Sequence, residues 1–90
     1  MILNIRPGNL NEEYEFDELI NTVNSRKAAD FHIDLEQTTK INLSKFNALI
    51  KLYVNMRREG RNLCYSNMQV SIRHLVDKTN FHHVFKKKNT

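Results

Sequence analysis

The stretch "IDLEQTTKINLSKFNALIKLYVNMRREG", residues 33 to 60, decides the fold because the period of its apolar residues changes partway along. Residues 31 to 35 alternate apolar and polar side chains, which predicts a strand. After Ser44 the apolar residues cover one broad arc at helical spacing, and Gly60 can end the helix in the left-handed conformation. A turn is therefore expected between them, with Asn42 as the helix N-cap.

The same two patterns continue on both sides of this stretch. Strands are predicted at residues 2–6, 62–66 and 82–85, and helices from an N-cap at Asn11 to Arg26 and over 68–78. Strands that alternate with helices favour parallel pairing, because each connection contains a helix. The expected fold is α/β, a small and mostly parallel sheet of about four strands with three helices. The side chains expected inside are Ile33, Leu35, Phe46, Leu49, Tyr53, Leu63, Leu75 and Val84.

Length and composition limit the possible classes of protein. The 90 residues predict a single domain over 1–90, with 86–90 as a basic tail. Cys64 is the single cysteine, so an intramolecular disulfide is excluded, and the thiol is expected to be buried in its strand. No apolar stretch approaches the length of a membrane span, and a soluble cytoplasmic protein is expected.

Charge is divided unevenly along the chain. Residues 1–45 hold five Lys/Arg against eight Asp/Glu and residues 46–90 hold nine against two, which gives −3 and +7 of the total +4. A basic half can mark a nucleic-acid surface. Solvation at a helix end and in the tail explains much of the excess, so nucleic acid is the less favoured partner. The residues concerned are Arg57, Arg58, Arg61, Arg73 and Lys86 to Lys88.

The sequence offers little for catalysis or metal binding. It lacks a glycine-rich phosphate loop, a nucleophile elbow and a carboxylate pair presented by a turn. The four histidines lack a metal-ligand spacing, and structural roles are expected for His32, His74, His82 and His83. A binding module without a cofactor is therefore expected rather than an enzyme.

Several short elements follow the spacing of a known family. Residues 8–11, "GNLN", stand where that family has Gly-x-Leu-Asp, and Asp34-Leu35 stands at the end of its apolar strand. Residues 42–44, "NLS", stand where it has Asp-Ser-Ser at a helix start, and Gly60 and "IRHLVDKTNFHHVF", residues 72 to 85, follow in register. On these residues the chain resembles a STAS domain, the fold of anti-sigma-factor antagonists.

The resemblance implies a protein-binding regulatory module. In anti-sigma-factor antagonists, the first serine of the turn accepts phosphate from a serine kinase that is also an anti-sigma factor, while other relatives bind a transporter ATPase. Leu43 stands at that position and cannot accept phosphate. Ser44 is a possible phosphorylation site, although a plain helix-start role is favoured. The partner-binding residues implied are Asn42, Leu43, Ser44, Lys45 and Asn47.

Family members usually carry one more strand ahead of the one that precedes Gly-x-Leu-Asp. The printed sequence offers no segment for it, so residues 2–6 are expected to form a sheet edge. A bare edge exposes unpaired backbone groups and invites pairing with another chain. Self-association through this edge, as in a homodimer, or strand addition by a partner is therefore expected.

Overall fold

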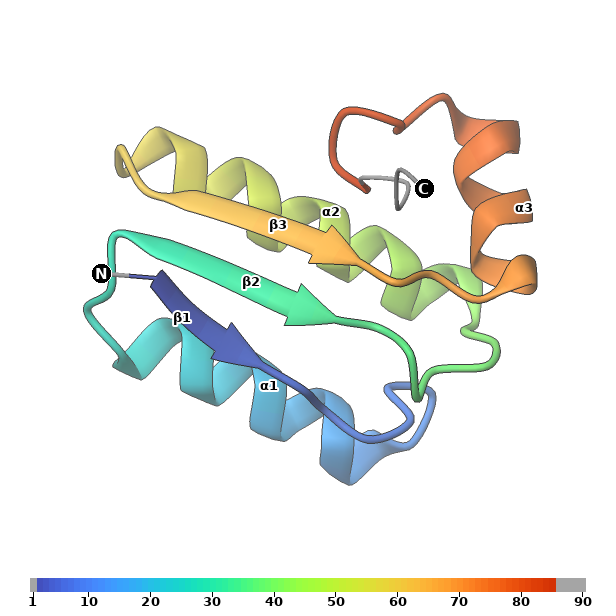
Figure 1. Ribbon diagram of the computed structural model, residues 1–90, viewed down its shortest axis with the longest axis horizontal. Helices are drawn as coiled ribbons and strands as arrows, with labels where there is room; N and C mark the ends of the chain where they lie inside the picture. Colours follow the sequence, from blue (N-terminus) through green and yellow to red (C-terminus); the bar gives the residue numbers. More distant parts are fainter. Residues whose placement is uncertain (1, 86–90) are drawn as a thin grey trace.

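The computed structural model describes residues 2–85, in which strands and helices alternate (Figure 1). The order is β1 (Ile2–Ile5), α1 (Glu13–Ser25), β2 (Asp30–Asp34), α2 (Leu43–Arg58), β3 (Asn62–Ser66) and α3 (Val70–Thr79). The three strands form one parallel sheet in the order β1-β2-β3. This confirms the predicted α/β fold with three helices.

The two faces of the sheet differ in their side chains. Helices α1 and α2 lie behind the sheet in Figure 1 and cover one face. In register, Ile5 lies beside Ile33 and Ile33 beside Tyr65, and all three pack into the core under these helices. On the opposite face Asn4 and His32 are exposed. Alternation along each strand thus produces one apolar and one polar face.

Cys64 lies on the polar face and is only half-buried, so the expectation of a buried thiol is wrong. Its neighbours Leu63 and Tyr65 point into the core, and alternation turns Cys64 the other way. His32, its register partner on β2, shares that face.

Two helices begin at residues other than those predicted. The N-cap position of α1 is Glu12, and Asn11 instead accepts a hydrogen bond from the backbone N–H of Asn42 at 3.0 Å. Helix α3 begins at Val70, with Gln69 at the N-cap in an extended conformation and Met68 buried ahead of the helix. Asn11 is therefore a link between the start of α1 and the start of α2.

The predicted last strand at residues 82–85 is reduced to one bridge, between Tyr65 and Phe85. The N–H groups of Val84 and Phe85 both donate to the Phe81 carbonyl, at 3.0 and 3.2 Å, so the preceding residues form a turn. Asn80 turns the chain with a left-handed φ of 61°. The expected basic tail, residues 86–90, lies outside the described residues.

An aromatic stack joins α2, β3 and the last described residue. The ring of Phe85 stacks on Phe46 at 5.1 Å and on Tyr65 at 4.9 Å between centroids. The Tyr65 hydroxyl donates to the Leu49 carbonyl at 2.8 Å, and burial raises the pKa of this phenol well above its ordinary value. The predicted core is confirmed, except that Leu75 is only partly buried at its rim.

Candidate docking surface at the helix starts

The start of α2 combines a side-chain cap with an exposed apolar residue. Asn42 has extended backbone angles, and its Oδ1 accepts a hydrogen bond from the Lys45 backbone N–H at 2.8 Å, which confirms the N-cap. Leu43 is the first helical residue and its side chain is 58% exposed. Ser44 and Asn47 are exposed as well. Four of the five residues implied by the resemblance are thus accessible at the helix start.

Lys45 differs from the other four because its side chain is only 15% exposed. Its Nζ lies 3.2 Å from a carboxylate oxygen of Glu13 and 5.9 Å from the centre of the Phe16 ring. The lysine therefore connects α2 to α1, and its charge is balanced within the chain. What α2 presents at its start is mainly uncharged.

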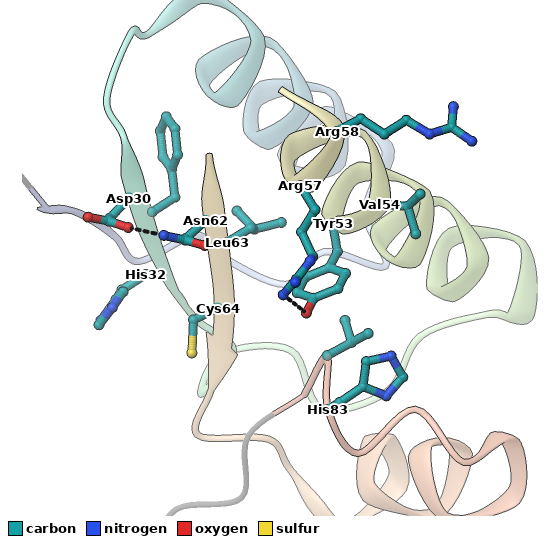
Figure 2. Close-up of a pocket in the computed structure, with 12 residues that line it drawn as sticks. Asp30, His32, Tyr53, Val54, Arg57, Arg58, Asn62, Leu63, Cys64 and His83 are labelled. Atoms are coloured by element: carbon teal, nitrogen blue, oxygen red, sulfur yellow. Dashed lines mark hydrogen bonds between the residues drawn. The ribbon is translucent and has the colours of Figure 1, made fainter. Parts of the chain in front are cut away.

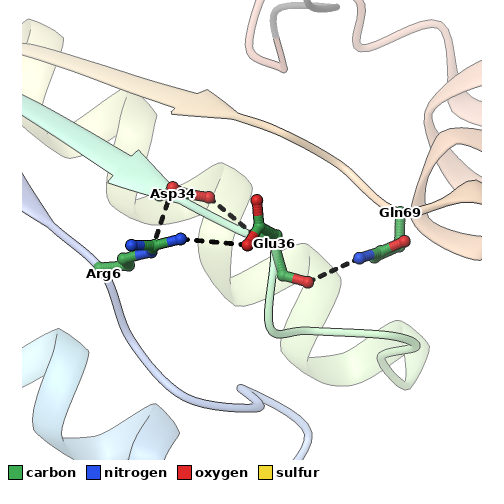
Figure 3. A network of polar contacts seen from close by, with 4 residues as sticks. All are labelled: Arg6, Asp34, Glu36 and Gln69. Carbon is green, nitrogen blue, oxygen red and sulfur yellow. Dashed lines mark hydrogen bonds and ion pairs between the residues drawn. The ribbon is translucent and has the colours of Figure 1, made fainter.

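The turn before α2 is held by a polar network at the carboxyl ends of the strands (Figure 3). Arg6 lies 3.0 Å from the Glu36 carboxylate and 3.6 Å from that of Asp34. Asp34 Oδ1 also accepts from the Glu36 N–H at 2.9 Å, and Gln69 donates to the Glu36 carbonyl at 2.6 Å. Residues after β1, β2 and β3 are thereby joined around the turn.

A buried threonine holds the other side of the same turn. Thr38 is fully buried, accepts from the Leu10 N–H at 3.0 Å and donates to the Gly8 carbonyl at 3.4 Å. The Ser71 hydroxyl donates to the Thr39 carbonyl, which ties the turn to α3. The position of Leu43 is therefore set by contacts from three separate segments of the chain.

Two further apolar residues are exposed in the same way as Leu43. Tyr14 is 71% exposed and Val70 is 60% exposed, and each lies in the first turn of its helix. All three helices begin at the arrowhead end of the sheet (Figure 1), as parallel alternation requires. We call Tyr14, Leu43 and Val70, together with Asn42, Ser44 and Asn47, the helix-start surface.

Sequence reasoning missed Tyr14 and Val70, although a signal was present. At helical spacing, Tyr14 points nearly opposite to the arc that carries Phe16 and Leu19, and Val70 nearly opposite to Ile72. An apolar side chain on the polar side of a first turn is the pattern that would have found both.

The arginines of the predicted basic surface do not behave alike. Arg61 donates to the carbonyls of Ala28 at 3.0 Å and Arg26 at 2.7 Å, and pairs with Glu59 at 3.0 Å. Its guanidinium also lies 5.3 Å from the Phe31 ring centre. Arg61 therefore joins the ends of α1 and α2. Its guanidinium is engaged within the fold, although the sequence predicted it as part of a basic surface.

Within residues 2–85, no three histidine, cysteine or acidic side chains lie together in a way that could hold a metal ion. Nor does any helix in that range have the length and apolar character needed to cross a membrane. The helix-start surface itself consists of apolar, amide and hydroxyl groups, which suit contact with another protein.

Strands and helices together form a small parallel α/β domain with three exposed apolar side chains at its helix starts. The family model of the STAS domain matches residues 10–90, so the chain belongs to the STAS domain family. STAS domains commonly mediate protein–protein interactions and are generally non-enzymatic. A comparison with curated proteins gives no match.

Proposed function

We propose that this chain is a non-catalytic regulatory module that binds a protein partner through the helix-start surface. The exposure of Leu43 at the start of α2, at the same end as Tyr14 and Val70, carries the proposal. Large apolar side chains exposed singly are ordinary, but three at one end of a small domain favour a surface that a partner covers. The hydrogen bonds and ion pairs that fix the turn before α2 also support the proposal, because a preordered surface loses less conformational entropy on binding.

The favoured partner is an anti-sigma factor with serine kinase activity, and a transporter ATPase is the alternative. Family membership supports both, since anti-sigma-factor antagonists dock through the equivalent helix start. Such a pair would meet in the cytoplasm of a bacterium. Nucleic acid is less favoured because Arg61 is engaged within the fold.

We further propose that phosphorylation does not switch this surface. Leu43 stands where relatives carry the phosphoacceptor serine, and the next hydroxyl, that of Ser44, is rotated by about 100° around the helix axis. A kinase aligned to the first position would not find the Ser44 hydroxyl in the same place. The chain is then a constitutive binder of its partner.

A comparison of three immobilised baits tests the docking surface. Wild type, Leu43→Asp and the control Asn55→Asp are exposed to native cytosol, and recovered proteins are quantified by mass spectrometry. Asn55 is exposed further along the same helix, so it controls for a new charge on α2. A true partner should be retained by wild type and Asn55→Asp and fall at least about tenfold with Leu43→Asp, because a carboxylate enters a desolvated contact. Equal recovery on all three baits would remove the helix start from the interface.

The proposal that phosphorylation does not control binding is tested with a kinase recovered in this way. The protein is incubated with that kinase and ATP. Wild type should stay unmodified by intact-mass analysis, whereas Leu43→Ser should gain one phosphate. Stoichiometric phosphate on Ser44 in cell-derived protein would overturn the constitutive mode of binding.

The edge of β1 supports a proposed homodimer. Within residues 2–85, β1 pairs only with β2, and Ile2 on this edge is 54% exposed. Strand addition from a second copy would pair the open backbone groups. Sedimentation equilibrium should show a concentration-dependent dimer that Asn4→Pro abolishes, since the Asn4 N–H lies on the open edge in this register and proline removes it. A strict monomer at millimolar concentration would exclude it.

A further inference from the structure

A concave site lies beside the last two turns of α2, away from the helix start that carries Leu43 (Figure 2). A cavity of about 950 Å³ opens between β3 and the last two turns of α2. Tyr53, Val54 and Arg57 line it from α2, Leu63 lines it from β3, and His83 closes it near the end of the described chain. We call this cavity the β3-edge groove, and the helix-start surface contributes no residue to its lining.

The backbone of β3 is partly unpaired along this groove. The Asn62 N–H donates to the Ala29 carbonyl and the Ser66 carbonyl accepts from Leu35, so both face β2. Alternation turns the peptide groups of Leu63 to the other edge. There Tyr65 is bridged to Phe85, but within residues 2–85 no strand pairs with Leu63 on that side. The N–H and C=O of Leu63 therefore have no strand partner among the described residues.

The rim of the groove carries positive charge. Arg57 and Arg58 are exposed, and neither forms an ion pair with any residue between 2 and 85. Arg57 is oriented by a 3.2 Å hydrogen bond to the Tyr53 hydroxyl and lies 5.8 Å from the centre of that ring. An arginine held in this way is ready for a carboxylate, which it can bind through two parallel hydrogen bonds.

Two carboxylates beside the groove, those of Asp30 and Glu59, already have partners within the fold. Asp30, on the far side of the groove, accepts from the Asn62 side chain at 2.8 Å. Glu59 pairs with Arg61 at 3.0 Å. Within residues 2–85 the charge of Arg57 and Arg58 is thus not paired with either carboxylate.

We propose that the β3-edge groove binds an extended, acidic peptide segment of another protein as a short added strand. Its backbone pairs with Leu63, an apolar side chain contacts Tyr53 and Val54, and a carboxylate binds Arg57 or Arg58. The chain's own last residues fit poorly as the occupant, because Lys86 to Lys88 carry the same sign of charge as the arginines. This interaction is independent of docking at the helix starts.

Fluorescence anisotropy with synthetic peptides tests the charge requirement. The probes are labelled peptides of about eight residues, a usual strand length, that alternate valine with glutamate or valine with lysine. Only the glutamate peptide should bind, and Arg57→Glu should weaken it at least about tenfold, as expected for a lost charge-assisted hydrogen bond. Lys51→Glu is the matched control, because it makes the same charge change on α2 but lines a separate cavity against α1.

Amide hydrogen exchange of the wild-type protein tests the backbone pairing without any substitution. The glutamate peptide should slow exchange of the Leu63 N–H and leave the N–H groups of Tyr14 and Leu43 unchanged. The proposal is overturned if the lysine peptide binds equally, if Lys51→Glu weakens binding as much as Arg57→Glu, or if protection appears only at the helix starts.

Discussion

The two ends of α2 offer opposite surfaces to other molecules. At the start, Leu43 is exposed beside amide and hydroxyl groups, and the lysine of the first turn, Lys45, is balanced by Glu13. At the end, Arg57 and Arg58 are exposed without a carboxylate partner between residues 2 and 85. One helix can therefore serve an apolar contact and an electrostatic contact without interference between them.

Phe46→Ala is expected to have the largest effect, because both ends of α2 depend on the same core. Phe46 is fully buried and stacks on Phe85, so its truncation should lower the free energy of unfolding by about 3–5 kcal/mol. Urea denaturation followed by circular dichroism measures this loss. Asn47→Ala, at an exposed neighbouring position, is the control and should cost less than about 0.5 kcal/mol. A loss below about 1 kcal/mol for Phe46→Ala would contradict the packing.

Gly60→Ala probes the basic end of α2 alone. Gly60 has φ of +74°, and a Cβ there would meet no atom within 4 Å, so the penalty is purely conformational. The free energy of unfolding should fall by about 1–2 kcal/mol, the cost of a left-handed alanine. Gly60→Asn should recover part of the loss, since asparagine tolerates this conformation better. If alanine proves neutral in the same denaturation experiment, the helix does not end in a left-handed turn.

Tyr65→Phe probes the contact that anchors the middle of α2. Loss of the hydrogen bond to the Leu49 carbonyl should cost about 1 kcal/mol. Burial raises the pKa of the folded-state phenol, so above pH of about 10 the unfolded chain loses its proton first and stability falls. Below that pH both states hold the proton and this dependence vanishes.

Urea midpoints measured from pH 8 to 11 would therefore separate the two proteins. Wild type should lose stability more steeply above about pH 10 than Tyr65→Phe does. Parallel curves over this range would show that Tyr65 is not shielded from water.

The ion pair of Lys45 with Glu13 should have the smallest effect, because Glu13 is 80% exposed and an exposed ion pair contributes less than about 1 kcal/mol. A double-mutant cycle of Lys45→Ala and Glu13→Ala measures this coupling energy apart from the packing of the lysine, and it should shrink as salt is added. A coupling above about 2 kcal/mol, or one insensitive to salt, would mean that Lys45 is a main support of the α2 start.

The fold could be predicted from the sequence largely because burial controls periodicity. Phe31, Ile33 and Leu35 alternate since one face of β2 is covered, and all three are fully buried. The last strand could not be predicted in the same way. Whether residues 82–84 pair with β3 depends on local hydrogen bonds to Phe81, which compete with the sheet and leave no trace in the apolar pattern.

The candidate site was only partly predictable. The N-cap Asn42 follows from residue type and spacing, because capping is local chemistry. The contacts of Asn11 and Lys45 depend on how α1 packs against α2. The residue pattern within a single helix does not specify this packing. Tyr14 and Val70 join Leu43 only once the parallel topology brings three helix starts to one end.

The helix-start surface is discontinuous, since its apolar members come from α1, α2 and α3. A short synthetic peptide spanning only the Leu43 turn should compete poorly, because it lacks the other two contacts. A partner would recognise the folded chain alone, and mass action would then oppose unfolding by about 2.7 kcal/mol when the free partner exceeds its Kd a hundredfold. The resistance of the chain to proteolysis would therefore rise with the concentration of its partner, and molecules without a bound partner would be degraded first.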